Sequence, residues 1–389
     1  MWLEFPPNHF NPMNISDLRA RCAQSLLAGA GRAPAMSAFV GLDGFVDEIL
    51  HAVDKRESAE VYQRLPTIAK LAERLAGAAG KSTNLELVNQ MTKLGGNGPI
   101  MANALAGFGL KVTYLGLLGY PNLHPVFEDF ATRAEVHSIA DPGTTDALEF
   151  EDGKIMVGKH ASLKQMTWEN IQSRFGREKF DAKFGGADLV GFVNWTMLPY
   201  MSDLWESILS EVCPGMKGPR RILFFDLADP EKRIREDIRR ALELIGQFEK
   251  YFNVILGLNE KEAHEIGEVF GLRPKTAGRE SLAEFGLQIA SKLTVGMLVI
   301  HPVACALAVS GGKVEMADGP YVAKPLITTG AGDHFNSGFC LGKLLGLDNA
   351  MSLLTGVTAS GYYVRTGQSP SITQVAGMMA DSAVSYSPP

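Results

Sequence analysis

Residues 328–339 combine residue types that could perform phosphoryl transfer. Three residues with little or no side chain lead directly into an acid: Gly330, Ala331, Gly332 and then Asp333. A helix with apolar spacing is predicted to follow, from Phe335 to about residue 345. Amides in the first turn of a helix lack intrahelical partners and lie at the positive end of the dipole, so unobstructed amides can bind an anion. Asp333 could then take the proton of a hydroxyl while the amides of Ala331 and Gly332 stabilise charge on a transferred phosphoryl group.

The helix dipole alone offers a second explanation for Asp333. An acid in the first turn of a helix is favoured whether or not it reacts. Helix formation does not require the small residues that precede Asp333, whereas an anion site does. The segment therefore favours phosphoryl transfer to a hydroxyl.

Two further segments are candidate ligand contacts. Asp43 and Asp47 lie four residues apart at the carboxyl end of a predicted strand, residues 38–42, where open α/β sheets bind ligands. A turn acid and a solvated acid would give the same pattern. The second segment is Gly95-Gly96-Asn97-Gly98, whose glycines allow close backbone approach to a ligand, and Pro99 suits the first turn of the helix that follows.

A third pair of polar residues follows a later strand. Asn259 and Glu262 are three apart, so on the first turn of a helix they share a face and could meet a metal-bound water and a phosphate. Asn is also a common N-cap, and Glu at the third helical position completes a capping box. On this stretch alone, capping is the favoured interpretation.

Short apolar runs, separated by helical stretches, predict the sheet that would position these residues. The runs are 38–42, 111–116, 187–193, 221–226, 254–258 and 296–300. Runs of this kind fit buried parallel strands, so the predicted fold class is α/β, with a doubly wound, mostly parallel sheet flanked by helices. Hairpins are predicted at Asp152-Gly153 and at Gly311-Gly312, and the first is a candidate lid or small second sheet.

Two segments before residue 90 lie outside this alternation. Residues 1 to about 35 are predicted to be an N-terminal extension, with a short helix and then a linker from Gly29 to Pro34. Residues 57–79 place apolar side chains at steps of three and four, which predicts a helix. The following residues, 77–83, fail as a P-loop because Leu75 occupies the position of the first glycine.

Composition excludes several classes of function. Apolar residues make up 46% of the 389-residue chain and charged residues 21%, which is ordinary for a globular protein. The net charge is −6 and no run of five or six basic residues occurs, which argues against a nucleic-acid or acidic-membrane partner. The four cysteines form no C-x-x-C pair and are predicted to be reduced. With neither a secretory signal nor a long apolar run, the chain is predicted to be cytoplasmic.

Together these segments resemble the PfkB or ribokinase-like carbohydrate kinases over residues 37–375. The most specific part of the resemblance is residues 328–339, whereas residues 95–98 look like the family's Gly-Gly signature and Asn259-x-x-Glu262 like its Asn-x-x-Glu motif. The resemblance implies a ribokinase-like domain over residues 36–380 that transfers phosphate from ATP, with Mg²⁺, to a hydroxyl of a sugar or sugar-like substrate. A small β lid would close over the sugar, with strands at about 45–56, 84–94 and 143–160.

The resemblance also implies roles for individual residues. Asp333 would be the general base, with an anion hole made of Gly330, Ala331 and Gly332. Substrate hydroxyls would meet Asp43, Asp47, Gly95, Gly96 and Asn97. ATP and its phosphates would meet Asn259, Glu262, Thr329 and Gly356, with Glu262 reaching the metal through water. Small residues around Gly356 would leave room for adenine, although close helix packing explains them equally well.

Two positions depart from the family pattern. Ile327 stands where the family often has an acid that helps to hold a monovalent cation, which places potassium activation in doubt. Ile100 stands where ribokinase-like members often have an Asn that contacts the sugar, so ribose itself is a poor candidate substrate.

The sequence alone does not identify the substrate. A nucleoside kinase of the same family would share the acid and the glycines, and an ADP-dependent sugar kinase of a related fold would have a similar Gly-x-Gly-Asp segment. A non-catalytic sugar-binding sensor with this fold is a third alternative, against which Asp333 argues because a binding protein needs no base. Lids in this family often pair edge to edge, so a homodimer through the lid is a further expectation.

Overall fold

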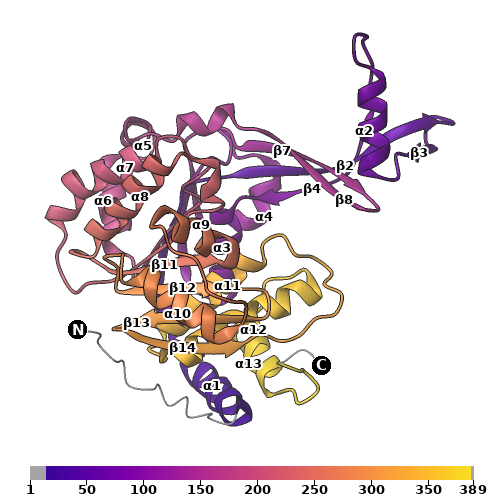
Figure 1. Cartoon of the computed structure of the whole chain (residues 1–389). Coiled ribbons are helices and arrows are strands. Elements are labelled where there is room, and N and C mark those ends of the chain that lie inside the picture. Colours follow the sequence, from indigo (N-terminus) through magenta and orange to yellow (C-terminus); the bar gives the residue numbers. More distant parts are fainter. Residues whose placement is uncertain (1–14, 387–389) are drawn as a thin grey trace.

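The computed structural model describes residues 15–386, and its centre is a nine-stranded sheet (Figure 1). The strand order is β14-β13-β12-β11-β10-β9-β1-β5-β6. The strands are β1 Ser37–Gly41, β5 Lys111–Gly116, β6 Glu135–Ser138, β9 Leu189–Val193, β10 Ile222–Asp226, β11 Asn253–Asn259, β12 Met297–His301, β13 Cys305–Ser310 and β14 Lys313–Asp318. Pairing is parallel from β6 to β12 and antiparallel at β13 and β14. The predicted hairpin at Gly311-Gly312 joins these last two strands and is confirmed.

Helices cover both faces of this sheet, each over its own apolar core. One core lies beneath α5 Trp168–Arg174, α6 Arg177–Gly186, α7 Met201–Ser207, α8 Arg235–Phe248, α9 Glu260–Val269 and α10 Arg279–Ala290. The other lies beneath α1 Ile15–Gly29, α3 Asn97–Gly107, α4 Glu128–Ala131, α11 Ala331–Leu344, α12 Asn349–Thr366 and α13 Ile372–Ala380. A sheet wound on both sides in this way confirms the predicted α/β class.

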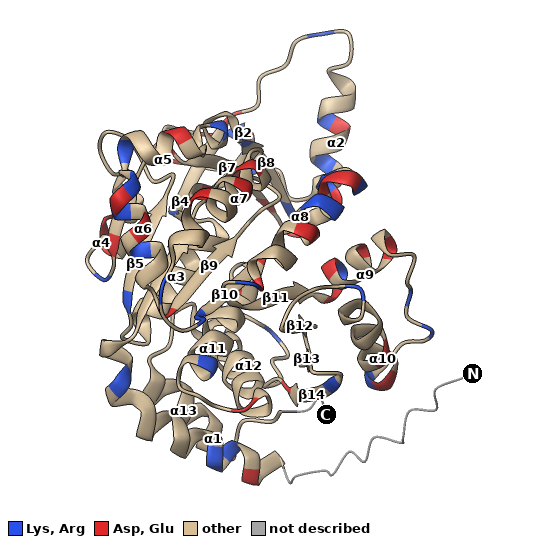
Figure 2. Cartoon of the chain, turned by 90° about the vertical axis from the view of Figure 1, so that its left-hand side faces the viewer, with Lys and Arg blue, Asp and Glu red and all other residues tan. Residues whose placement is uncertain are grey.

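Charged residues of both signs are interspersed along the outer helices. Figure 2 shows acidic and basic positions together along α2 (Ile68–Gly77) and α8, whereas α9 is acidic apart from Lys261. Within residues 15–386, no helix is both long enough and apolar enough to span a bilayer. The four cysteines all lie in this described part, where they are buried and form no disulfide.

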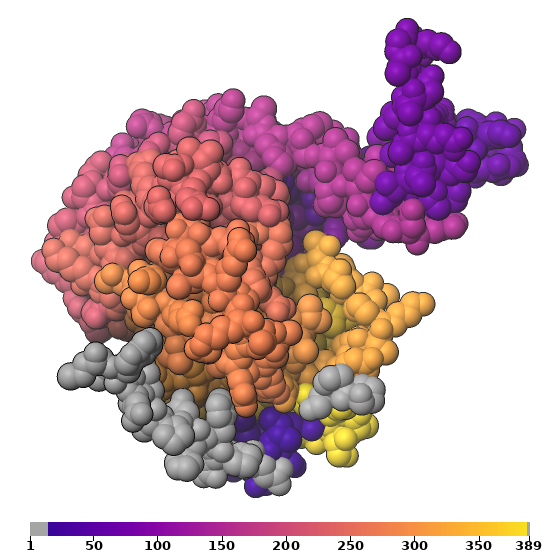
Figure 3. Space-filling view, in the orientation of Figure 1, coloured from indigo at the N-terminus to yellow at the C-terminus, as the bar shows by residue number. Residues whose placement is uncertain are grey.

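A second, smaller sheet projects from the body (Figures 1 and 3), and we call it the lid. Its strands are β2 Phe45–Arg56, β3 Tyr62–Arg64, β4 Leu87–Gly95, β7 Gly143–Phe150 and β8 Gly153–Lys159. β2 pairs antiparallel with β4 and parallel with β7, and the predicted hairpin at Asp152-Gly153 is confirmed between β7 and β8. α2 packs on one side of the lid over a core of its own: Leu50, Ala52, Leu65, Leu71, Leu148 and Phe150.

The helix predicted over residues 57–79 is wrong in its first half. Residues 62–64 form β3 against β2, and α2 begins only after Thr67, whose side chain accepts a hydrogen bond from the amide of Lys70. Pro66 disfavours a helical conformation for the residue before it, which separates strand from helix. Leu65, just after β3, and Leu71, in α2, reach the same core, and this imitates the spacing of a single helix.

Residues 15–35 are part of the body, which corrects their prediction as an extension and linker. α1 packs against α12 and α13, with Leu18, Cys22 and Leu26 buried in the shared core. The predicted linker is a 3₁₀ turn, Ala30–Ala35, that leads directly into β1. The predicted segment before Ile15 lies outside the described residues.

Candidate active site

Asp43 anchors the start of α3 from the carboxyl end of β1. Its Oδ1 accepts a hydrogen bond from the amide of Gly98 at 2.9 Å, and its Oδ2 accepts from the amide of Asn97 at 3.0 Å and from Nδ2 of Asn194 at 2.7 Å. The side chain is fully buried, which raises the pKa of Asp43 to about 6 although these bonds lower it. A carboxylate held by this many protein donors positions the helix, so the structure argues against the predicted contact of Asp43 with substrate.

The glycines of residues 95–98 are required by the two acids beside them. A Cβ at Gly95 would lie 2.6 Å from Cγ of Asp47, and one at Gly98 would lie 2.5 Å from Oδ1 of Asp43. Gly96 also has φ of +98°, a conformation that side chains rarely adopt. The turn therefore wraps around Asp43 and Asp47, a contact that the sequence pattern alone did not specify.

Asp47 lies at the base of the lid, on β2. In the lid sheet it is opposite Lys93 of β4 on one side and Thr145 of β7 on the other. Burial raises the pKa of Asp47, while the charge of Lys93 and a hydrogen bond from Thr145 lower it. Burial also lowers the pKa of Lys93, and Asp47 partly offsets this. No motif marked Lys93 or Thr145 in the sequence, because only strand pairing places them beside Asp47.

Asp333 meets the glycine turn in the first turn of α11. Nδ2 of Asn97 donates to Oδ1 of Asp333 at 3.1 Å, across 236 positions of the chain. The helix begins after Gly330, which has φ of +93°. Asp333 is 5% exposed, and its pKa is raised well above the ordinary value by burial and by the charge of Asp226, while the bond from Asn97 lowers it. The predicted base and one predicted acceptor contact are therefore neighbours.

Asp226, at the carboxyl end of β10, is a buried acid that the sequence reasoning missed. Its Oδ2 accepts from Nδ2 of Asn336 at 2.8 Å, and its Oδ1 accepts from the amide of Ala228 at 2.9 Å. Its charge raises the pKa of both Asp333 and Glu262. The same rule that selected Asp43, an acid at the end of an apolar strand, would have selected Asp226.

Asn259 and Glu262 form the capping box that was the favoured interpretation. The amide of Glu262 donates to Oδ1 of Asn259 at 2.9 Å, and the amide of Asn259 donates to Oε2 of Glu262 at 2.8 Å. Oε1 of Glu262 accepts from the amide of Asp229 at 2.9 Å. Burial and the nearby Asp226 raise the pKa of Glu262. Both oxygens are thus already bonded, so a metal would meet Glu262 through water.

A cavity of about 500 Å³ opens beside α11 and has a mixed lining. Asn259, His301, Thr328, Ala331 and Gly332 contribute polar side chains or backbone groups. Its mostly apolar part includes Pro320, Tyr321, Val322, Pro325, Val357 and Val364. The predicted anion-hole residues Ala331 and Gly332 therefore line a space whose groups could bind both a phosphate and an aromatic base.

Three of the four predicted nucleotide contacts, Glu262, Thr329 and Gly356, do not line this cavity. Gly356 packs within the helix pair, where an added Cβ would lie 2.8 Å from the ring of Phe335, so close helix packing explains it. Thr329 faces a different cavity, and Thr328 takes the place predicted for it. The adjacent Val357 and Ser360 of α12 are the residues that face the nucleotide-sized space.

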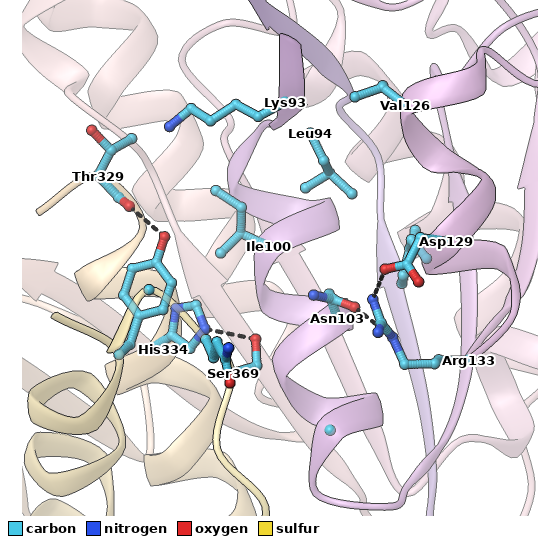
Figure 4. Close-up of a pocket in the computed structure, with 15 residues that line it drawn as sticks. Lys93, Leu94, Ile100, Asn103, Val126, Asp129, Arg133, Thr329, His334 and Ser369 are labelled. Carbon is cyan, nitrogen blue, oxygen red and sulfur yellow. Dashed lines mark hydrogen bonds and ion pairs between the residues drawn. The ribbon is translucent and has the colours of Figure 1, made fainter. Parts of the chain in front are cut away.

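The second cavity, of about 490 Å³, is lined by residues of α3 and α4 and by Thr329, His334 and Tyr363 (Figure 4). His334 and Tyr363 stack at its edge, with ring centroids 3.7 Å apart. Nδ1 of His334 lies 2.7 Å from the carbonyl oxygen of Gly330. The hydroxyl of Tyr363 donates a hydrogen bond to the backbone carbonyl oxygen of Thr329 at 2.9 Å. These two side chains hold the loop that carries the predicted anion hole.

Comparisons with known proteins point to one family. A sequence model of the family described as "Prokaryotic ketohexokinase" matches residues 17–382. A ketohexokinase from Haloferax volcanii is 30% identical over 337 residues, which cover 86% of this chain and 88% of that protein.

Solved structures share the fold at low sequence identity. A carbohydrate kinase from Agrobacterium tumefaciens has a TM-score of 0.60 at 18% identity, covering 88% of this chain and 97% of that one. A ribokinase from Arabidopsis thaliana, solved with ribose and ATP, has a TM-score of 0.59 at 17% identity, covering 89% and 99%. These similarities establish the fold, including the small lid sheet.

Proposed function

This chain belongs to the prokaryotic ketohexokinase family, and from that premise we propose that it transfers a phosphoryl group from ATP to a hydroxyl of a ketohexose such as fructose. The chain is a carbohydrate kinase of the ribokinase-like fold, as the resemblance predicted. The proposal of ATP as donor and a ketohexose as acceptor rests on the family match, together with a buried acid, Asp333, that accepts a hydrogen bond from Asn97 of the glycine turn.

In this proposal Asp333 accepts the proton of the attacking hydroxyl. Burial and the charge of Asp226 make Asp333 a stronger base than an exposed carboxylate, because they raise its pKa. The hydrogen bond from Asn97 orients the carboxylate without neutralising it. The amides of Ala331 and Gly332, which line the 500 Å³ cavity, stabilise charge on the phosphoryl group as it is transferred.

The 500 Å³ cavity is the proposed ATP site. Its apolar side chains would contact the base, and the amides beside Gly332 would take the phosphates. Mg²⁺ would be held near Asp226 and Glu262, which are buried acids outside the cavity lining whose repulsion a divalent cation would relieve. Glu262 would hold it through water, and the bound metal supplies charge neutralisation of the phosphates.

The acceptor site is proposed to lie between the glycine turn and the base of the lid. Asp47 and Thr145 offer polar atoms for sugar hydroxyls, and Lys93 adds a half-buried ammonium next to them. Ile100 presents an apolar side chain at the neighbouring 490 Å³ cavity. Closure of the lid would bring Asp47 over the sugar and exclude water from the reaction.

We also propose that two copies of the chain pair through the lid. Cross-strand pairing places Met91, Ile49, Ala147 and Met156 in one row on the face that carries Asp47. Met91 and Met156, at the ends of this row, are 55% and 52% exposed. Exposed apolar side chains gathered on a projecting sheet are typical of a surface that a partner covers.

A panel of acceptors with ATP, measured by ADP release, tests the function. We expect fructose or another ketohexose to give the highest kcat/KM, well above glucose, ribose and adenosine. A second panel with fructose and either ATP or ADP as donor should show activity with ATP. Preferred phosphorylation of a nucleoside, or transfer from ADP alone, would contradict the proposal.

A further inference from the structure

Part of the lining of the 500 Å³ cavity belongs to an irregular segment, residues 319–328, between β14 and α11. The residues of this segment that line the cavity are Gly319, Pro320, Tyr321, Val322, Pro325 and Thr328. The side chains of Tyr321 and Leu326 are exposed, so burial of these two side chains does little to hold the segment. A segment without a helical or strand ladder is held by its individual contacts with neighbouring segments. Those contacts therefore determine the shape of this part of the cavity.

Both backbone polar groups of Tyr321 are bonded to other segments. Its amide donates a hydrogen bond to the carbonyl oxygen of Ser385 at 2.8 Å. Its carbonyl oxygen accepts a hydrogen bond from Nη2 of Arg365 at 2.6 Å. Nη1 of the same guanidinium donates to the carbonyl oxygen of Gly361 at 2.8 Å, so Arg365 ties Tyr321 to α12. Arg365 itself lies outside the cavity lining, and it reaches the cavity only through Tyr321.

Residues 381–386 are in turn anchored in the body by Tyr386. Its ring is buried, and its hydroxyl lies 2.9 Å from Oγ1 of Thr358 on α12. The guanidinium carbon of Arg19, on α1, lies 4.3 Å from the centre of the ring, which is a favourable cation–π distance. Ser385, which accepts the hydrogen bond from the cavity wall, is the residue directly before this anchor. The anchor therefore fixes the position of the acceptor that holds the wall.

Resting on the proposed function, we infer that Arg365 and residues 381–386 are positioning elements of the nucleotide site, which hold residues 319–328 in the arrangement that binds ATP. A segment that is already ordered loses little conformational entropy when a ligand binds, whereas a released segment must be ordered at the expense of affinity. The coupling is reciprocal, so a bound nucleotide must also favour the docked state of residues 381–386. Sugar binding depends on the glycine turn and the base of the lid, so it should not change.

Hydrogen exchange of the full-length wild type, followed by mass spectrometry, tests this coupling without measuring catalysis. Saturating ADP should slow exchange severalfold in the peptides that cover residues 319–328 and residues 381–386. Saturating fructose should leave exchange of residues 381–386 unchanged. Protection of residues 319–328 by ADP with no change at residues 381–386 would show that the two segments are independent and would overturn the inference.

Calorimetric titration of ADP and of fructose into variants measures the size of the effect. Arg365→Met and Tyr386→Ala should each bind ADP about tenfold more weakly than the wild type and bind fructose equally well. Arg365→Lys can still donate a hydrogen bond to Tyr321, and Tyr386→Phe keeps the ring beside Arg19, so both should recover part of the ADP affinity. Arg273→Met, at an arginine whose side chain is 81% exposed, is the matched control and should bind both ligands as the wild type does.

Circular dichroism verifies that each variant is folded. Equal loss of ADP and fructose affinity in Arg365→Met and Tyr386→Ala would indicate a general loss of structure and would overturn the inference. Unchanged ADP binding by both variants would do the same. If the wild type bound fructose but no adenine nucleotide, the proposed nucleotide site itself would fail, and the inference with it.

Discussion

Asp333 shares the centre of the molecule with other acids. Asp226, Asp43 and Glu262 all raise its pKa, whereas its carboxylate accepts a hydrogen bond from the neutral amide of Asn97. Such an arrangement destabilises the carboxylate and makes it a better proton acceptor, which is common where acids perform chemistry. In the proposed mechanism, this cost to stability falls at a position where the negative charge accepts the proton of the substrate.

Replacement of Asp333 by Asn should remove turnover and leave binding intact. The amide keeps the shape and can still bond to Asn97, but it cannot accept the hydroxyl proton, so kcat should fall by roughly a thousandfold or more. Steady-state kinetics and calorimetric titration with sugar and ADP measure the two effects. Asp348→Asn, an N-cap of α12 replaced by an equally good cap, is the matched control and should retain activity. Normal turnover by Asp333→Asn would contradict the assigned role.

Asp226→Asn should move the pH dependence of kcat. The charge of Asp226 raises the pKa of Asp333, so its removal lowers that pKa, and the acidic limb of the profile should shift by about one unit to lower pH. When kcat is expressed as a fraction of each protein's maximum, Asp226→Asn would then stay active at a low pH where the wild type has lost activity. The measurement is kcat against pH, with Asp129→Asn on α4 as an exposed control. A limb that stays in place would show that Asp226 does not act on the base.

Potassium should have little effect on the rate. The carbonyl oxygens of Thr329 and Gly330 already meet Tyr363 and His334, so the loop is held by side chains in place of a cation. We expect kcat in potassium chloride to equal that in tetramethylammonium chloride at the same ionic strength. Tyr363→Phe should lower kcat in both salts because it frees the Thr329 carbonyl. Strong activation of the wild type by potassium would refute this expectation.

At the scale of elements, the joint between β4 and α3 connects the lid to the body. The glycines of this joint leave room for the carboxylates of Asp43 and Asp47. One acid belongs to the end of β1, and the other belongs to the lid strand β2. The joint therefore fixes the position of the lid base relative to α3, and through Asn97 relative to α11.

Gly95→Ala tests this joint. The added Cβ would lie 2.6 Å from Cγ of Asp47, so the carboxylate must shift away from the acceptor site. We expect KM for the sugar to rise about tenfold or more, with a smaller change in kcat and in KM for ATP. Gly77→Ala in α2, where no atom lies within 4 Å of the added Cβ, is the control and should behave like the wild type. Circular dichroism verifies folding, and an unchanged sugar KM would argue against the contact.

At the scale of the whole molecule, the lid projects away from the body (Figure 3). Strand pairing places the exposed Met91 and Met156 on the face of the lid that carries Asp47. A partner on this face would cover Met91 and Met156. Closure over the sugar and pairing with a second copy would both remove the same apolar area from water. The proposed assembly and the proposed lid movement are therefore linked through one surface.

Met91→Lys should weaken the dimer. A charge placed in an apolar interface must be desolvated, so sedimentation equilibrium should show a shift from dimer toward monomer. Ile234→Lys, a 65% exposed position on the body, should leave the assembly unchanged. If the wild type sediments as a monomer at all concentrations, the lid does not mediate pairing.

The sequence by itself determined those features that depend on neighbouring residues. Small residues before Asp333, glycines at hairpin turns and short apolar runs each restrict the local backbone, so the α/β class, both hairpins and the family resemblance could be predicted. The spacing of apolar residues gave a wrong helix prediction where two different segments of the chain share one core. Leu65 and Leu71 imitated a single helix because the segment after β3 and the helix α2 both face the lid core.

Only the tertiary structure decided which distant residues meet. The bond between Asn97 and Asp333, the charge of Asp226 beside the base, and the stacking of His334 on Tyr363 join segments far apart in the chain. It also decided that Asp43 is saturated by protein donors, that Gly356 packs against Phe335, and that Tyr321 is bonded to Ser385. Burial and hydrogen-bond partners arise from packing between elements, and no pattern within one segment contains that information.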